Sequence, residues 1–262
     1  MPATDLDLLI AAAQAAGQLA TSFSGPTAKR WDKDAGAGPV TEADLAVDRL
    51  LRERLTGARP DYGWLSEETP DSPDRLDRAR VFIVDPIDGT RSFIDGSATW
   101  AHSLAVAEDG QITAAVVFLP LKNKLYTAAA GQGACLNGNP IRASAPDGIS
   151  GASMLAARPV YDPGNWRGNA VPAMERHHRP SLAYRLSLVA EGRFDAMLTL
   201  RPSWEWDIAA GALILQEAGA RTTDRTGAAL RFNNPHPQVN GVLAAGDRLH
   251  RALADRLAPW PG

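Results

Sequence analysis

The stretch VDPIDGTRSF, residues 84–93, follows the apolar run Val81–Ile83 and decides how the rest of the chain is interpreted. It places Asp85 and Asp88 three residues apart, directly after a segment typical of a buried strand, and then breaks at Gly89. An ordinary turn needs only one Asp or Asn and a glycine. Two carboxylates held close together repel each other unless a cation lies between them. The stretch therefore raises the hypothesis of a metal site at the end of a strand.

The residues between and after the two acids suit a magnesium site beside an anion site. Mg²⁺ prefers oxygen ligands and keeps several waters, so a site needs few carboxylates from rigid elements. Pro86 would fix the backbone, and the Ile87 carbonyl could serve as a further oxygen ligand. Gly89 would let the backbone approach closely, and the amides of Gly89 and Thr90 would begin a helix, where a phosphate oxygen is favoured.

Other acids stand at the ends of apolar elements: Asp44, Glu67 with Glu68, and Asp207 in WEWDIAAG, residues 204–211. Each acid alone has an ordinary explanation as a turn residue, a first-turn helix acid or a solvated end. The conjunction of four such places favours a metal site over these separate explanations.

Two other metal motifs fail on spacing. Haloacid-dehalogenase-type phosphatases use Asp-x-Asp near the N-terminus, whereas here Asp88 follows Asp85 by three residues and the motif lies near position 85. An EF-hand loop counted from Asp85 would need a glutamate at its twelfth position, which is Gly96.

Composition limits the class of protein. The chain has 262 residues, 45% of them hydrophobic, which is enough for one large domain or two closely packed lobes. A net charge of −3 without a basic run argues against a nucleic acid polymer as partner. The single cysteine, Cys135, rules out an internal disulfide and suits a cytoplasmic location. The acidic N-terminus, interrupted by Gln14 and Gly17, indicates neither a signal peptide nor a transmembrane segment.

Periodicity and turn residues predict layered α/β or α+β structure. In the first half we expect a helix over 4–20 capped by Thr4 or Asp5, a loop over 24–40, a helix over 41–55, strands in 61–70 and 80–84, a hairpin over 103–120 turned by Glu108–Gly110, and short strands over 124–144. In the second half we expect helices over 182–192, 207–219 and 247–257 and strands over 194–200 and 241–245. The proline-rich stretch 145–180 is the predicted seam between an N-terminal lobe, 1–145, with most metal ligands and a C-terminal lobe, 146–262, with Asp207 and substrate contacts.

Four motifs, in order along the chain, resemble the inositol monophosphatase superfamily of Mg²⁺-dependent, lithium-sensitive phosphomonoesterases. They are VTEAD at 40–44, SEET at 66–69, DPIDGT at 85–90 and WDIAAGALILQEAGA at 206–220. Weaker similarities occur in GACLNGNPIRAS at 133–144 and LVAEGRFD at 188–195. The resemblance covers nearly the whole chain and implies an alternating α-β-α-β-α sandwich.

The resemblance also implies a set of metal ligands. Glu67, Asp85 and the Ile87 carbonyl would hold the first Mg²⁺, and Asp85, Asp88 and Asp207 would hold the second. The family leads us to expect two or three ions in all.

Catalytic and phosphate-binding roles follow from the same resemblance. Thr90 and Asp44 would orient and deprotonate the attacking water, and the amides of Gly89 and Thr90 would bind the phosphate. Lys33 stands eleven residues before Asp44, as a loop lysine does in the inositol phosphatases. It could approach the site or remain a solvated loop charge.

The substrate, a small-molecule phosphate ester, is less closely specified. In the inositol phosphatases an acidic residue seven positions before the Trp-Asp aspartate contacts sugar hydroxyls, and here that position holds Leu200. The segments 91–94, 184–192 and 201–207 instead resemble the 3′(2′),5′-bisphosphate nucleotidases of sulfate assimilation. Ala183 and Trp204–Glu205 depart from the nucleotidase pattern.

A substrate with a second phosphate favours cationic and aromatic groups near the site. The candidates are Arg91, Arg185, Arg201, Trp100 and Trp204. Arg91 could instead be a helix-surface residue, and tryptophans such as Trp100 and Trp204 are more often core residues than platforms for a base.

The leading hypothesis is therefore a nucleotidase that converts adenosine 3′,5′-bisphosphate to AMP and phosphate. An inositol-1-phosphatase or a histidinol-phosphate phosphatase stays open, and a non-catalytic module that senses metal and phosphate is a distant alternative. A homodimer is possible, since inositol phosphatases typically form dimers and the nucleotidases are often monomers.

Overall fold

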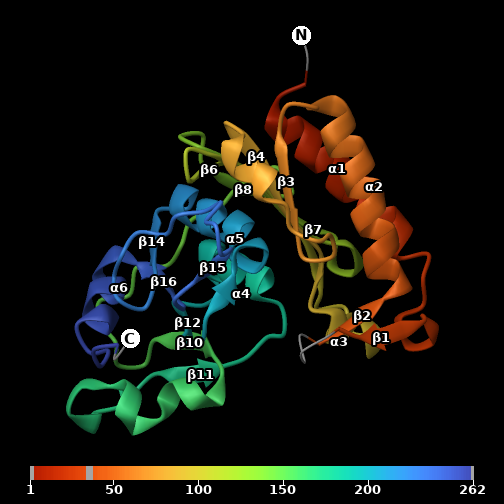
Figure 1. The fold of residues 1–262 in the computed structure, drawn as a ribbon. Helices are drawn as coiled ribbons and strands as arrows, with labels where there is room; N and C mark the ends of the chain where they lie inside the picture. The colour runs from red at the N-terminus through yellow and green to blue at the C-terminus, as the bar shows by residue number, and fades with distance from the viewer. Residues whose placement is uncertain (1–2, 34–37, 261–262) are drawn as a thin grey trace.

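The computed structural model describes residues 3–33 and 38–260, and in this part of the chain six helices alternate in layers with two larger sheets (Figure 1). The helices are α1 (Asp5–Ala20), α2 (Glu42–Ala58), α3 (Thr90–Ile94), α4 (Leu182–Ala190), α5 (Glu205–Glu217) and α6 (Asp247–Ala254). Thr4 caps α1 and Thr41 caps α2, each in a capping box with the acid three residues later. Both predicted helix starts are confirmed.

The large sheet has seven strands in sequential order. They are β3 (Gly63–Ser66), β4 (Arg80–Asp88), β5 (Ala101–Glu108), β6 (Gln111–Leu119), β7 (Lys124–Ala129), β8 (Ala134–Leu136) and β9 (Asn139–Pro140). Only the β3–β4 pair is parallel, and the others are antiparallel. The predicted hairpin is β5–β6, which turns at Asp109 and Gly110, both with positive φ.

The second sheet has five strands in the spatial order β11 (Glu175–His177), β10 (Ser153–Ala156), β12 (Ala196–Thr199), β16 (Val242–Gly246) and β14 (Ala220–Thr223). Two further pairs are short: β1 (Arg30–Asp32) with β2 (Pro39–Thr41), and β13 (Ser203–Trp204) with β15 (Gln238–Val239). Single 3₁₀ turns occupy Gly25–Thr27, Pro73–Asp77, Pro120–Lys122, Arg158–Tyr161, Pro163–Asn165 and Arg167–Asn169.

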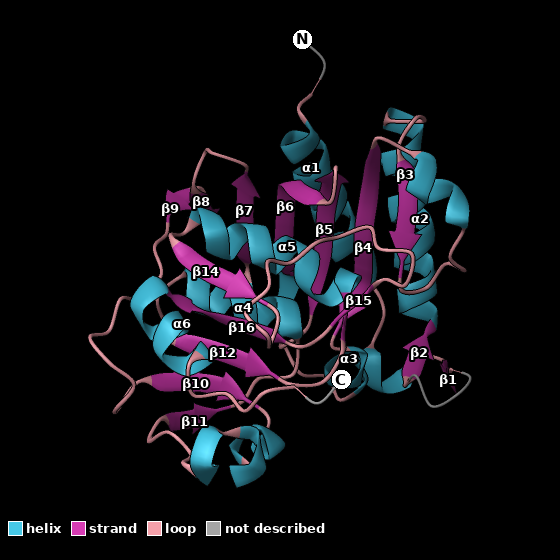
Figure 2. Ribbon diagram, turned by 60° about the vertical axis from the view of Figure 1, so that its left-hand side comes forward, coloured by secondary structure: helices cyan, strands magenta, loops and turns pink. Residues whose placement is uncertain are grey.

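The layers follow from which faces are apolar. α1 and α2 cover one face of the large sheet, α4 and α5 lie between the two sheets, and α6 packs on the outer face of the second sheet (Figure 1; Figure 2). In β4, Phe82 and Val84 face α1 and α2, whereas Val81 and Ile83 belong to the core around α4 and α5. The sequence of a strand that is buried on both faces is one continuous apolar run. The predicted layered α/β fold is confirmed.

Three expectations about the elements need correction. The stretch 24–40 is not simply a loop, because β1 and β2 pair within it; residues 34–37 lie outside the described part. The predicted seam 145–180 contains β10, which pairs with two neighbours in the second sheet. The hydrophobic run at β10 is short and lies in a proline-rich stretch, so the sequence did not indicate a strand there. The last helix ends at Ala254 rather than residue 257. The lobe boundary at 145/146 stays a prediction.

No helix within the described ranges, 3–33 and 38–260, is both long and apolar enough to span a membrane.

Candidate active site

The acidic motif lies at a bulge in β4. Asp85 pairs with Ser103 and Asp88 with Ala101, so β4 carries one residue more than β5 across this interval. A bulge is one of the few places where a sheet accepts proline, since no ladder hydrogen bond from Pro86 is needed. The buried ring of His102 hydrogen-bonds the Pro86 carbonyl through Nδ1. The strand thus continues to Asp88 rather than ending at residue 84, and the bulge redirects the side chains that follow.

Three carboxylates from separate elements meet beside this bulge. Glu67 follows β3, Asp85 lies in β4, and Asp207 lies in the first turn of α5. One oxygen from each lies within 4.8 Å of the other two. Asp88 points instead to the start of α4, where one of its oxygens accepts hydrogen bonds from Ser181 Oγ (2.6 Å) and the Ala183 amide (2.7 Å).

The electrostatics of this cluster favour a bound cation. Burial and the charges of Glu67, Asp88 and Asp207 raise the pKa of Asp85 well above its ordinary value, and burial with Asp88 and Glu67 does the same for Asp207. Asp85 Oδ1 is buried and has no hydrogen-bond partner among the described residues. Burial also raises the pKa of Asp88 to about 6, although its two hydrogen bonds act in the opposite direction. Carboxylate oxygens with unused lone pairs at this spacing fit a divalent cation such as Mg²⁺.

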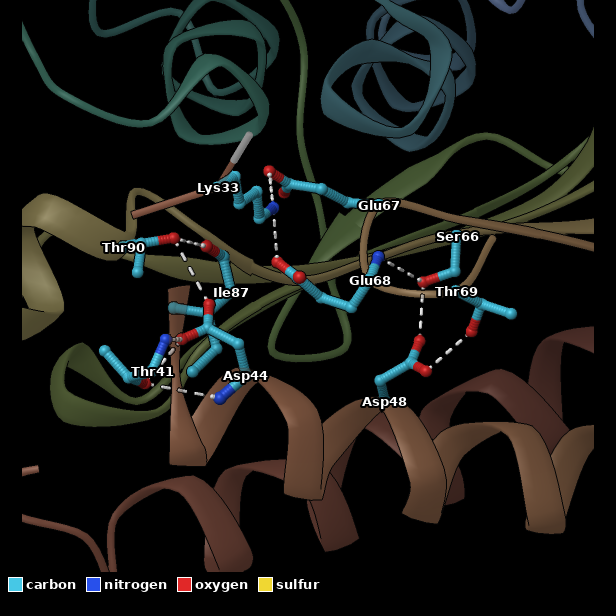
Figure 3. Close-up of polar contacts among 10 residues, drawn as sticks. All are labelled: Lys33, Thr41, Asp44, Asp48, Ser66, Glu67, Glu68, Thr69, Ile87 and Thr90. Atoms are coloured by element: carbon cyan, nitrogen blue, oxygen red, sulfur yellow. Dashed lines mark hydrogen bonds and ion pairs between the residues drawn. The ribbon is translucent and has the colours of Figure 1, made fainter. Parts of the chain in front are cut away.

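Asp44 and Thr90 lie together, as Figure 3 shows. Thr90 Oγ1 donates to Asp44 Oδ1 (3.2 Å) or to the Ile87 carbonyl (3.3 Å). The other oxygen of Asp44 accepts from the Thr41 amide (2.8 Å) and the Thr41 hydroxyl. Burial raises the pKa of Asp44 to about 6, against the effect of the Thr41 hydrogen bonds. A carboxylate with this pKa can accept a proton near neutral pH.

Lys33 reaches the acidic cluster from the end of β1. Its Nζ donates to Glu67 Oε1 and Glu68 Oε1, both at 2.7 Å (Figure 3). Burial alone would lower the Lys33 pKa, but Glu67 and Glu68 outweigh it and hold that pKa above its ordinary value. Burial raises the pKa of Glu68 to about 7, with a further contribution from Glu67. Of the two interpretations of Lys33, the structure shows the approach to the site.

One residue at the site was missed from the sequence. Asp48 on α2 accepts hydrogen bonds from Ser66 Oγ (2.6 Å) and Thr69 Oγ1 (2.7 Å), so it holds both sides of the Glu67–Glu68 segment to the helix (Figure 3). Asp48 is 6% exposed, which is unusual for an unpaired acid. The signal was available, because Asp48 follows Asp44 by four residues and therefore lies on the same face of α2.

A pocket of about 770 Å³ opens beside the carboxylates, and we call it the catalytic pocket. Its lining includes Glu67, Asp88, Gly89, Thr90 and three arginines, Arg91, Arg185 and Arg201. His178 also lines it, and burial with the neighbouring arginines lowers the pKa of that histidine. Arg185 is buried; its guanidinium donates to the Arg179 and Pro180 carbonyls and contacts His178 Nε2 at 2.8 Å. Burial lowers the pKa of Arg185 to about 10.

The two tryptophan candidates lie elsewhere. Trp100 is 2% exposed and packs against Phe93 and His102, so it is a core residue rather than a base platform. Trp204 stacks on Trp206 with ring centroids 4.7 Å apart and does not line the catalytic pocket. Sequence alone could not separate these positions, because a buried and a substrate-facing tryptophan have the same composition signal.

Comparison with known proteins places this geometry in a family. The inositol monophosphatase family model matches residues 2–259. The chain belongs to the inositol monophosphatase family. An inositol-1-monophosphatase of Rhizobium meliloti is 36% identical over 230 residues, covering 82% of this chain and 81% of the relative. Nus factor SuhB of Escherichia coli is 32% identical over 258 residues, covering 95% and 93%.

Solved structures agree with the family assignment. An IMPase of Thermotoga maritima has a TM-score of 0.81 to this chain at 28% identity, with 95% of each chain covered. Members of the inositol monophosphatase family are metal-dependent phosphomonoesterases, so the chain is a phosphoric monoester hydrolase. The alternative of a non-catalytic sensing module is not retained. The layered sandwich implied by the resemblance is confirmed.

Proposed function

We propose that this chain is a Mg²⁺-dependent phosphomonoesterase whose substrate carries a second anionic group, with adenosine 3′,5′-bisphosphate as the first candidate. The observation that carries the proposal is the juxtaposition of an acidic metal cluster with three arginines in one pocket. Cations would neutralise the carboxylates, and the arginines offer charge-assisted hydrogen bonds to an anion that the cations do not reach.

Five residues would hold two or three Mg²⁺ ions: Glu67, Asp85, Asp88 and Asp207 through carboxylates, and Ile87 through its carbonyl. When bound, the ions would supply positive charge for the attacking and leaving oxygens of an in-line displacement. Without them, the buried acids of this cluster repel a phosphate, so we expect activity to disappear when the ions are removed.

The remaining chemistry belongs to residues already in contact. Thr90 Oγ1 would take a proton from the attacking water as it passes its own proton to Asp44 Oδ1, which lies 3.2 Å away. The amides of Gly89 and Thr90, at the start of α3, would bind phosphate oxygens. Lys33, held by Glu68, would remain close to the cluster after Glu67 turns to a cation.

The pocket wall favours an anionic leaving group over an uncharged polyol. Arg91, Arg185 and Arg201 line it, whereas the position expected to hold a sugar-binding acid is Leu200. A polyol in this pocket would leave the arginines without a negatively charged partner. Inositol-1-phosphate is the second candidate, and the inositol-1-monophosphatases of Rhizobium meliloti and Caulobacter vibrioides among the relatives favour it.

A phosphate-release assay with the purified chain tests both the Mg²⁺-dependent phosphatase activity and the choice of substrate. The substrates are adenosine 3′,5′-bisphosphate, inositol-1-phosphate, histidinol phosphate and fructose-1,6-bisphosphate, each with Mg²⁺ or EDTA. We expect release only with Mg²⁺ and the highest kcat/KM for the bisphosphate nucleotide. Arg201→Gln should raise KM for that substrate, and Arg248→Gln, an exposed arginine on α6, is the matched control. A preference for inositol-1-phosphate would overturn the nucleotide assignment and leave the phosphatase assignment intact.

Oligomeric state, a cytoplasmic location, lithium inhibition and a role in sulfate assimilation stay predictions tied to the substrate class. Sedimentation analysis checks the possible homodimer, and LiCl in the same assay checks inhibition.

A further inference from the structure

A second cavity, of about 330 Å³, has a lining that the catalytic chemistry does not use. Its six lining residues are Thr99, Lys122, Lys124, Arg179, Tyr184 and Arg193, and we call it the basic pocket. Four of the six carry positive charge, two carry a hydroxyl, and none is acidic. Protein surfaces usually mix both signs of charge, because like charges gathered in one place repel each other.

Neighbouring acidic side chains neutralise only part of this charge. Lys124 Nζ forms an ion pair with Glu191 at 2.7 Å, and Tyr126 also donates to that carboxylate at 2.9 Å. Within residues 3–33 and 38–260, no acidic side chain forms an ion pair with Lys122, Arg179 or Arg193. Three cations around one cavity therefore have hydrogen-bond donors that no carboxylate uses.

The basic pocket and the catalytic pocket share a wall. His178 and Pro180 line the catalytic pocket, while Arg179 between them lines the basic pocket. On α4, Arg185 faces the catalytic pocket and its neighbour Tyr184 lines the basic pocket. Arg185 Nε donates to the Arg179 carbonyl, so the two cavities are joined through hydrogen-bonded residues.

We propose that the basic pocket binds a phosphoryl dianion at a site separate from the catalytic carboxylates. The two arginines can donate forked hydrogen bonds to phosphate oxygens, and Lys122 adds a point charge. The Tyr184 side chain is 5% exposed and gives the pocket a rigid hydroxyl-bearing wall. The same chemistry would accept free inorganic phosphate or the phosphate group of a nucleotide. This proposal does not depend on which ester is hydrolysed.

Isothermal titration calorimetry with inorganic phosphate in EDTA tests it. Removal of divalent ions leaves the acidic cluster repelling phosphate, so binding in EDTA reports the basic pocket. We expect saturable binding of one phosphate, weakened by roughly tenfold or more in the Lys122→Gln/Arg193→Gln double variant. Arg52→Gln/Arg54→Gln, two exposed positions on α2, changes the net charge equally and should bind as the wild type does.

A second titration with AMP distinguishes the two sources of the anion. Tighter binding of AMP than of phosphate assigns the site to a nucleotide, and equal binding assigns it to the free anion. Both results support the proposal, provided that the double variant binds neither AMP nor phosphate as tightly as the wild type does.

Three results would overturn the proposal. They are no binding by the wild type, wild-type binding by the double variant, and loss of binding in Arg201→Gln alone, which would place the anion in the catalytic pocket. Lys122→Gln alone keeps the test valid if the double variant does not fold, because Lys122 is exposed and has no ion pair in the described structure. Mg²⁺-dependent phosphate release by the double variant checks separately that the catalytic site is intact.

Discussion

The two oxygens of the Asp44 carboxylate have different partners, so the first-turn helix acid and the predicted proton acceptor are compatible roles for one residue. Oδ2 completes the capping box with Thr41 at the start of α2, as a first-turn acid should. Oδ1 is left free to accept from Thr90, 46 residues further along the chain. A carboxylate has lone pairs for both roles, so a helix cap can also be a proton acceptor.

Thr90→Val tests the Thr90–Asp44 pair. Valine keeps the shape of threonine and removes the hydroxyl that links water to Asp44, so we expect kcat to fall by roughly 10²–10⁴-fold. The loss of a buried hydrogen bond should also cost about 1–3 kcal/mol of stability. Steady-state kinetics and thermal melts measure the two effects. Thr90→Ser is the matched control and should retain most activity; equal activity in both variants would contradict the pair.

Asp85→Asn separates function from stability. The variant should lose activity by roughly 10²–10³-fold, the size of effect seen when one group stabilising transition-state charge is removed. In EDTA, however, it should melt at or above the wild-type temperature, because Asp85 Oδ1 has no partner and neighbouring acids repel it. A melting temperature well below that of the wild type would mean that Asp85 is a structural acid.

At the scale of the elements, the contact between α2 and the segment after β3 depends on one buried acid, Asp48. Asp48 accepts from Ser66 and Thr69, and these two residues flank Glu67 and Glu68. Short segments after a strand are mobile unless their polar groups are held. The position of Glu67 therefore depends on a side chain that does not touch the cluster.

Asp48→Asn should weaken this hold while keeping the volume of the side chain. The amide cannot accept from both hydroxyls, so we expect a loss of about 1–3 kcal/mol in stability. The Mg²⁺ concentration for half-maximal activity should rise roughly 10–100-fold, as when an outer partner of a metal ligand is lost. Glu53→Gln, on the exposed face of the same helix, is the control for the charge change. An unchanged Mg²⁺ requirement would restrict Asp48 to a structural role.

At the scale of the whole molecule, the site is assembled by the helix layer between the two sheets. α4 contributes Ser181 and the Ala183 amide to Asp88, and α5 contributes Asp207. The two helices approach closely at Gly211, where an added Cβ would lie 2.6 Å from Leu186 Cβ. This contact sets how closely α4 and α5 approach each other.

Gly211→Ala should therefore destabilise the fold by about 1–3 kcal/mol, because the added carbon forces α4 and α5 apart. Gly57→Ala on α2 is the matched control: no atom lies within 4 Å of its added Cβ, and helix propensity predicts a gain of roughly 0.5–1 kcal/mol. Chemical denaturation of both variants measures the difference. A stabilised Gly211→Ala protein would show that the helix pair can relax without cost.

The buried acids also predict how stability depends on pH without metal. Asp44 and Asp88 have folded pKa values of about 6, above the ordinary value of 3.8, so the metal-free folded protein holds protons that the unfolded chain has lost. Their contribution to stability is complete below about pH 4 and is lost as the pH rises through about 6. In EDTA the melting temperature should fall by several degrees between about pH 5 and about pH 8.

Magnesium provides the control for this pH dependence. Mg²⁺ binds the deprotonated carboxylates, so a saturating concentration should remove or reverse the fall. A melting temperature in EDTA that rises over the same pH range would contradict the raised pKa values.

Local patterns determined the elements and the kind of chemistry. The apolar run before Asp85, the Thr-x-x-Asp before α2 and the turn at Asp109–Gly110 depend on neighbouring residues, and all three form as predicted. The acids at the ends of these elements likewise indicated metal chemistry, because several acidic motifs occur along the chain in the same order as in a known family.

Contacts between distant segments were decided only by the tertiary structure. The strand β10 among prolines and the core position of Trp100 leave little local signal. The three arginines of the catalytic pocket also leave little local signal, because Arg91 lies in α3, Arg185 in α4 and Arg201 in the loop after β12. A side chain's burial and partners depend on what packs against it from elsewhere in the chain, whereas the sequence around it fixes only its own backbone preference.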